Sequence, residues 1–128
     1  MARFYHVDIA RHASGADGKW IDNLLSHFTV PGVVGGRQGT PRRITESGVC
    51  HIVLIWRLYR ALGVRCSDSV SLAIRLLDGV AAIELVRGVE LTLDRPAFER
   101  EVARLVEQAV EAVVPARRGR PLARATVP

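Results

Sequence analysis

The sequence predicts a mostly α-helical protein with two short β-hairpins. Two observations support this class. Apolar residues recur at helical spacing in five separate stretches, and glycine-containing turns connect two pairs of segments that favour strands. The chain has 128 residues, of which 48% are hydrophobic, so it can bury the core of one domain. We therefore expect one domain's worth of folded chain, followed by a short appendage.

Two short helices are predicted at the N-terminal end, over residues 4–14 and 18–28. A glycine-containing turn separates them. Asp17 in this turn is a good N-cap, because its carboxylate accepts free N–H groups from the first turn of the second helix. Two short helices joined by such a turn outline a helix-turn-helix.

The second helix has one apolar face and one face that carries polar side chains. The apolar arc consists of Ile21, Leu24, Leu25 and Phe28. Lys19, Asn23 and His27 lie at i, i+4 and i+8, so they form one exposed stripe on the opposite arc. Trp20, at the border, is interpreted either as a contact to a nucleic-acid backbone or as part of the core, and the core is slightly favoured.

A hairpin with basic residues near its loop is predicted next. Residues 30–34 supply valines for a first strand, residues 42–45 form a second strand, and the glycines between them form the tip. The basic residues of this segment are Arg37, Arg42 and Arg43. They fit phosphate contacts made by such a hairpin, whereas Arg43 has the alternative of a structural ion pair with Glu46.

Two helices, a second hairpin and a last helix follow. The predicted elements are a helix over residues 46–62, a helix from Ser67 or Ser69 to Leu77, strands over residues 81–86 and 89–94, and a helix over residues 95–114. Thr45 and Gly63 are residue types that favour the start and the end of the first of these helices. The last helix has an apolar side formed by Phe98, Val102, Leu105, Val106, Ala109, Val110 and Val113.

The tail, residues 115–128, contains proline, glycine and arginine without periodicity, so it is predicted to be disordered when free. Within it, Arg118-Gly119-Arg120-Pro121 matches the core of an AT-hook, in which an extended Arg-Gly-Arg lies in the narrow minor groove of A·T-rich DNA. The alternative is an unspecific basic tail.

Charge is segregated along the chain. Residues 1–77 hold ten basic and five acidic side chains, residues 78–114 hold four basic and eight acidic, and residues 115–128 hold four arginines and no acid. The basic parts are suited to meet phosphates, while the acidic part packs elsewhere. An arginine-rich proteome would explain why 17 of the 18 basic residues are arginine, but it would not explain the segregation.

Three segments carry a resemblance to a family of DNA-binding proteins. Residues 7–11 resemble the opening helix of MerR-family regulators, residues 15–21 resemble their turn and the start of their recognition helix, and residues 36–45 resemble their basic wing. The resemblance covers residues 4–77 and implies a winged helix-turn-helix. Asp22-Asn23-Leu24 stands where that family has Arg-Tyr-Tyr, and its long coiled-coil helix is replaced by a hairpin and a shorter helix. DNA binding by helix and wing is the part of the family's function that the resemblance implies here.

The expected function is sequence-specific binding of double-stranded DNA by a homodimeric transcriptional regulator. We expect residues 1–79 to bind DNA, residues 80–114 to hold the dimer through the apolar side of the last helix, and residues 115–128 to add a basic tail. The predicted DNA-binding residues are Lys19, Trp20, Asn23, His27, Arg37, Gln38, Arg42, Arg43, Arg118 and Arg120. Two alternatives stay open: an antitoxin that binds a toxin through residues 80–114 and autoregulates through DNA, and a phage-type DNA-packaging or recombination factor.

Other classes of function are not expected. No set of residues has the signature of a nucleophile, a base and an orienting group, so neither an enzyme nor a cofactor is predicted. Cys50 and Cys66 fall at opposite ends of a predicted helix, which favours two buried thiols over a disulfide or a metal site. No apolar run approaches the roughly 18 residues of a membrane span, and no secretion signal is present, so the cytoplasm is the expected location.

Overall fold

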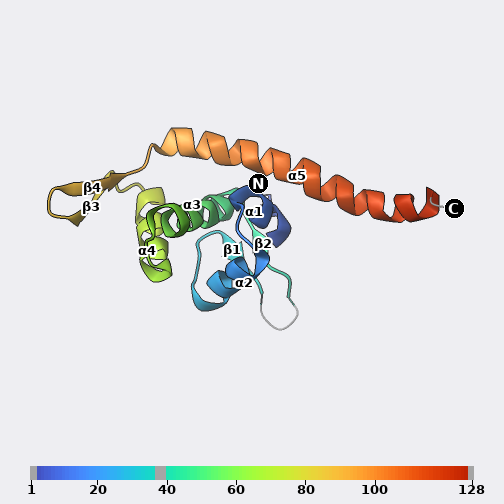
Figure 1. Cartoon of the computed structure of the whole chain (residues 1–128), viewed down its shortest axis with the longest axis horizontal. Coiled ribbons are helices and arrows are strands. Elements are labelled where there is room, and N and C mark those ends of the chain that lie inside the picture. The colour runs from blue at the N-terminus through green and yellow to red at the C-terminus, as the bar shows by residue number, and fades with distance from the viewer. Residues whose placement is uncertain (1–2, 37–39, 127–128) are drawn as a thin grey trace.

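A computed structural model of the chain describes residues 3–36 and 40–126, with the backbone alone for residues 114–126. Within these ranges the chain is mostly helical, with two antiparallel hairpins (Figure 1). The helices are α1 (Val7–Ser14), α2 (Gly18–His27), α3 (Glu46–Leu62), α4 (Cys66–Leu77) and α5 (Arg95–Thr126). The strands are β1 (Val33–Val34), β2 (Arg43–Ile44), β3 (Ala82–Val86) and β4 (Val89–Thr92). This order confirms the predicted class.

Helix α3 is the centre of the core and lies against α1, α4 and α5. Its bounds are the predicted ones, because both caps form. The Thr45 hydroxyl accepts a hydrogen bond from the Gly48 N–H at 3.1 Å, and Gly63 ends the helix with a φ of 69°. Val49, Ile52, Val53 and Ile55 are fully buried. Other elements are therefore positioned by how they pack on this helix.

The N-terminal residues begin with a β-bridge. The prediction extended the first helix back to Phe4, but Tyr5 instead pairs with Ile44 of β2, and both backbone hydrogen bonds form. His6 then caps α1 by accepting a hydrogen bond from the Asp8 N–H at 3.1 Å. The bridge satisfies backbone groups at the edge of the short hairpin, which the apolar periodicity of residues 7–13 does not reveal.

Hairpin β1–β2 is anchored on the start of α3. Its register pairs Val33 with Ile44, and Ile44 is fully buried. Gly32, just before β1, approaches the third residue of α3 so closely that a Cβ on Gly32 would lie 2.5 Å from the backbone nitrogen of Gly48. Two glycines are needed at this crossing, because neither backbone leaves space for a side chain.

Helix α4 starts without the predicted serine cap. It begins at Cys66, its N-cap Arg65 makes no capping side-chain hydrogen bond, and Ser69 is buried with its hydroxyl donating to the Val64 carbonyl at 3.1 Å. After α4, hairpin β3–β4 projects beyond the helices (Figure 1). Its tip exposes Val86 and Val89.

Helix α5 runs along α1 and α3, and it completes the core of the same chain (Figure 1). Phe98, Val102, Val106 and Ala109 are buried, and the remaining residues of the predicted dimer face pack against the core. Those partly buried residues are Leu105, Val110 and Val113. The apolar side that the sequence assigned to a dimer is thus covered within one chain, and α5 shares one core with residues 1–79.

Helix α5 also continues further than predicted. Its backbone is helical to Thr126, whereas the sequence predicted disorder from Pro115 onward. The prediction gave most weight to proline and glycine as helix breakers. Alanine, arginine and leucine make up most of residues 116–126, and these are among the best helix formers. Among the described residues, no helix combines the length and apolar character that crossing a bilayer requires.

Candidate nucleic-acid interface

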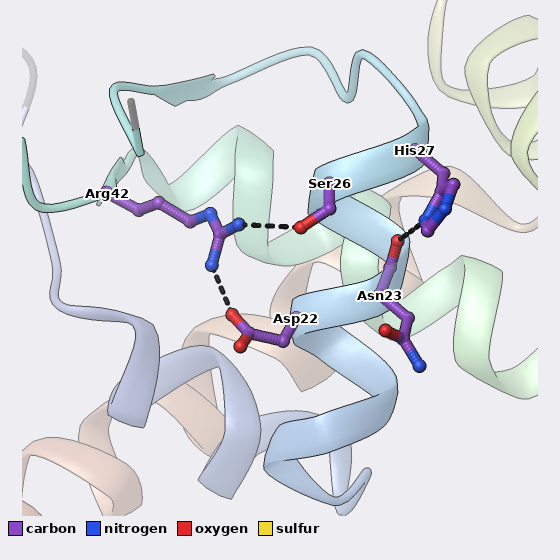
Figure 2. A network of polar contacts seen from close by, with 5 residues as sticks. All are labelled: Asp22, Asn23, Ser26, His27 and Arg42. Atoms are coloured by element: carbon purple, nitrogen blue, oxygen red, sulfur yellow. Dashed lines mark hydrogen bonds and ion pairs between the residues drawn. The ribbon is translucent and has the colours of Figure 1, made fainter. Parts of the chain in front are cut away.

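The exposed face of α2 carries the predicted polar stripe. Asp17 caps the helix by accepting a hydrogen bond from the Trp20 N–H at 2.7 Å, so the first turn is well formed. Lys19, Asn23 and His27 are all exposed, while Ile21 and Leu24 are buried beneath them. The side-chain amide of Asn23 points away from the hairpin and has no hydrogen-bond partner in the described part of the chain (Figure 2). It is therefore free to meet a ligand.

His27 has its ring orientation set by its own helix. Its Nδ1 lies 2.8 Å from the Asn23 carbonyl oxygen (Figure 2). A carbonyl oxygen can only accept a hydrogen bond, so Nδ1 is the donor in this contact, and in the tautomer that carries its proton on Nδ1 the other ring nitrogen, Nε2, is an acceptor. The stripe thus offers an ammonium donor, an amide that both donates and accepts, and an imidazole acceptor.

An aromatic cluster holds the other side of α2. Trp20 is half-buried and packs edge-on against Trp56 of α3, with ring centroids 4.8 Å apart. Tyr59 lies one turn further along α3, 5.6 Å from the Trp20 ring. Trp20 is therefore a packing residue that fixes α2 on α3, and its ring is occupied by these contacts.

Arg42 joins the hairpin to α2. Its guanidinium forms an ion pair with the Asp22 carboxylate and donates to the Ser26 hydroxyl at 3.2 Å (Figure 2). The side chain of Arg42 is 18% exposed, against 67% for Asp22. Arg42 was predicted as a free phosphate contact, but its charged end is already engaged by α2. Asp22 and Ser26 lie one turn apart, and helical spacing alone could not show that a residue 16 to 20 positions later reaches them.

Arg43 points elsewhere. Its guanidinium carbon lies 5.2 Å from the centroid of the Phe4 ring, and the residue is exposed. Among the described residues it makes no ion pair with Glu46, the alternative that the sequence left open.

Arg11, which the sequence analysis missed, lies over the start of α2, because a Cβ on Gly18 would be 3.6 Å from its Cδ. Two exposed cations, Arg11 and Lys19, therefore lie near the first turn of α2.

An open groove of about 600 Å³ separates the C-terminal end of α2 from hairpin β1–β2. Ser26 and His27 line it on the helix side, and Gly35, Gly36 and Arg42 line it on the hairpin side. The groove is open to solvent and mainly polar at its surface. Its walls are the same two elements that carry the exposed polar and basic residues.

Several predicted contacts are not brought to this surface. Arg37 and Gln38 lie outside the described residues. The side chains of Arg118 and Arg120 are also outside them, but the backbone there is helical, whereas an AT-hook needs an extended chain. In Figure 1 the C-terminal end of α5 extends past the other helices.

The buried titratable groups lie away from this surface. Burial raises the pKa of the Cys50 thiol to about 11, and burial lowers the pKa of His51, whose Nδ1 contacts the Ser47 carbonyl oxygen at 2.8 Å. Both residues are on α3. In the described ranges no three histidine, cysteine or carboxylate side chains cluster as metal ligands would.

Comparisons of the chain with protein-family models, with curated proteins and with solved structures found no match.

Proposed function

We propose that the chain binds double-stranded DNA sequence-specifically, through a winged helix-turn-helix in which α2 enters the major groove and hairpin β1–β2 lies on the backbone. The observation that carries the proposal is the exposed stripe of Lys19, Asn23 and His27 on α2, next to a basic hairpin. The opposite side of α2 is fixed on α3 by the aromatic cluster. A helix held in this way presents its polar face as one rigid unit.

The chemistry of the stripe suits base edges. The major groove is wide enough for an α-helix, and an asparagine amide can pair with N6 and N7 of adenine. Lysine suits the guanine acceptors or a phosphate, and an imidazole acceptor suits an amino group of adenine or cytosine. Two exposed cations, Lys19 on the first turn of α2 and Arg11 of α1 beside it, lie where phosphates would flank the groove.

The groove beside α2 suits the sugar-phosphate backbone. In the proposed arrangement, with α2 in the major groove and the hairpin on the backbone, a sugar-phosphate strand lies beside both elements. The open space of about 600 Å³ between α2 and the hairpin provides room for it. Arg43 on the hairpin is exposed and adds positive charge. A transcriptional regulator is the biological role that this arrangement favours.

The decisive test is selection of bound sequences from a random duplex pool at two salt concentrations, followed by Asn23→Ala on the selected site. If Asn23 reads a base, the variant loses about 1–3 kcal/mol on that site and relaxes the preference at one position. Gln108→Ala is the matched control, since it removes an exposed amide from α5. Failure of the wild-type chain to bind any duplex at low salt would refute the proposal.

A further inference from the structure

We propose that Arg42 is a positioning residue that neutralises the carboxylate of Asp22 on the exposed face of α2 and locks the hairpin beside that helix. The inference rests on the proposed DNA binding, since it assigns a selectivity device to the same surface. Asp22 is the only acidic residue in the sequence of α2. Because Asp22 holds the guanidinium, Arg42 makes no contact with phosphates, and the protein discriminates better between DNA sequences.

The geometry holds Arg42 from two directions. On one side its two terminal nitrogens engage Asp22 and Ser26, which lie at i and i+4 on α2 (Figure 2). On the other side the backbone of Gly36 lies close to the Arg42 side chain. A Cβ on Gly36 would lie 2.8 Å from both Cγ and Nε of Arg42. Gly36 has a φ of 92°, a conformation that glycine adopts without strain. The hairpin backbone and the helix thus enclose the same side chain.

The charges explain why this arrangement matters for DNA. An unpaired carboxylate next to Asn23 would face the phosphates of a bound duplex and repel them. Paired with Arg42, it contributes no net charge to the surface. The arginine in turn is unavailable for a phosphate contact, which would add affinity for every sequence alike. The ion pair therefore removes a non-specific contact between Arg42 and phosphate, and it fixes the distance between α2 and the hairpin.

Removing the carboxylate should release the arginine. We expect Asp22→Asn to steepen the decrease of log affinity with log salt by roughly 0.9, the value for one added phosphate contact. The affinity for a duplex of mixed sequence should rise more than the affinity for the selected site, so the ratio between the two affinities falls. The double variant Asp22→Asn with Arg42→Gln should return to the wild-type slope. If Asp22→Asn leaves the slope unchanged, Arg42 is not withheld by Asp22 and the inference is wrong.

A second measurement needs no DNA. Hydrogen–deuterium exchange at the backbone amides of β1 and β2 should speed up by about two- to fivefold in Asp22→Asn and in Arg42→Gln, the factor expected for losing an ion pair with one exposed partner. Exchange in α3 should not change. Glu99→Gln is the matched control, because it removes the 3.1 Å Arg95–Glu99 ion pair of α5 without touching the hairpin.

The two measurements separate the two proposals. If the wild-type chain binds no duplex but both variants loosen the hairpin, the DNA-binding proposal fails and the locking role of Arg42 stands. If the chain binds DNA normally but Asp22→Asn leaves the salt slope unchanged, or neither variant speeds up exchange in the hairpin, the inference alone is overturned.

Discussion

Replacing Gly48 by alanine tests whether the hairpin is seated on α3 as the structure describes. A Cβ on Gly48 would lie 2.7 Å from the Gly32 carbonyl oxygen and 2.8 Å from Cγ2 of Ile44. Ordinary carbon contacts begin near 3.5 Å, so the hairpin must move by roughly 0.7 Å or more. Such overpacking costs about 1–3 kcal/mol, whereas alanine gains at most about 1 kcal/mol in helix propensity. With the full gain subtracted, the expected net loss is about 1 kcal/mol at the middle of the overpacking range and about 2 kcal/mol at its upper end.

Thermal unfolding followed by circular dichroism measures this loss. For a chain of this size, about 1–2 kcal/mol corresponds to a decrease in Tm of roughly 4–8 °C. Gly18→Ala is the matched control, because it also adds a methyl group to a glycine in a first helical turn, but its nearest neighbour would be Cδ of Arg11 at 3.6 Å. This control should unfold at or slightly above the wild-type temperature. A Gly48→Ala chain as stable as Gly18→Ala would refute the close crossing.

Three further outcomes are expected. Burial lowers the pKa of His51 below the 6.5 of an unperturbed histidine. Between this lowered pKa and pH 6.5 the unfolded chain binds the proton and the folded chain does not. The free energy of unfolding therefore decreases as the pH is lowered through this window, by up to about 1.4 kcal/mol per pH unit, and His51→Gln should flatten that dependence in urea titrations. Trp56→Ala should lower the unfolding free energy by about 2 kcal/mol and change the emission of Trp20, whereas unchanged emission would contradict their contact. A thiol reagent should modify the half-buried Cys66 before the buried Cys50, and the reverse order would contradict the burial.

Local patterns predicted most of the elements. The bounds of α3 were correct because Thr45 and Gly63 are strong local signals for its two ends. Asp17 likewise defined the start of α2. Where a helix start depended on a weaker signal, the prediction was wrong by a few residues. The serines near the start of α4 are an example, since Ser69 uses its hydroxyl to reach the Val64 carbonyl and not to cap the helix.

Long-range packing was the part that the sequence could not supply. The apolar side of α5 was predicted correctly as a stripe, but its partner was assigned to a second chain. An apolar stripe in a sequence does not indicate which surface it packs against. In the structure it packs against α1 and α3 of the same chain. The sequence argument for a dimer through Phe98 and its neighbours was that one chain leaves this apolar side uncovered, and the structure removes that argument.

The candidate site shows the same division between local and distant information. The stripe of Lys19, Asn23 and His27 follows from helical spacing, and the structure places all three on one exposed face. What fixes that face is distant in sequence: Trp56 holds α2 from the core side, and Arg42 holds it from the hairpin side. Specificity in base recognition depends on rigid placement as much as on the residue types that reach the bases. The residues that supply this rigidity are therefore as informative about function as the stripe itself, and they are visible only in three dimensions.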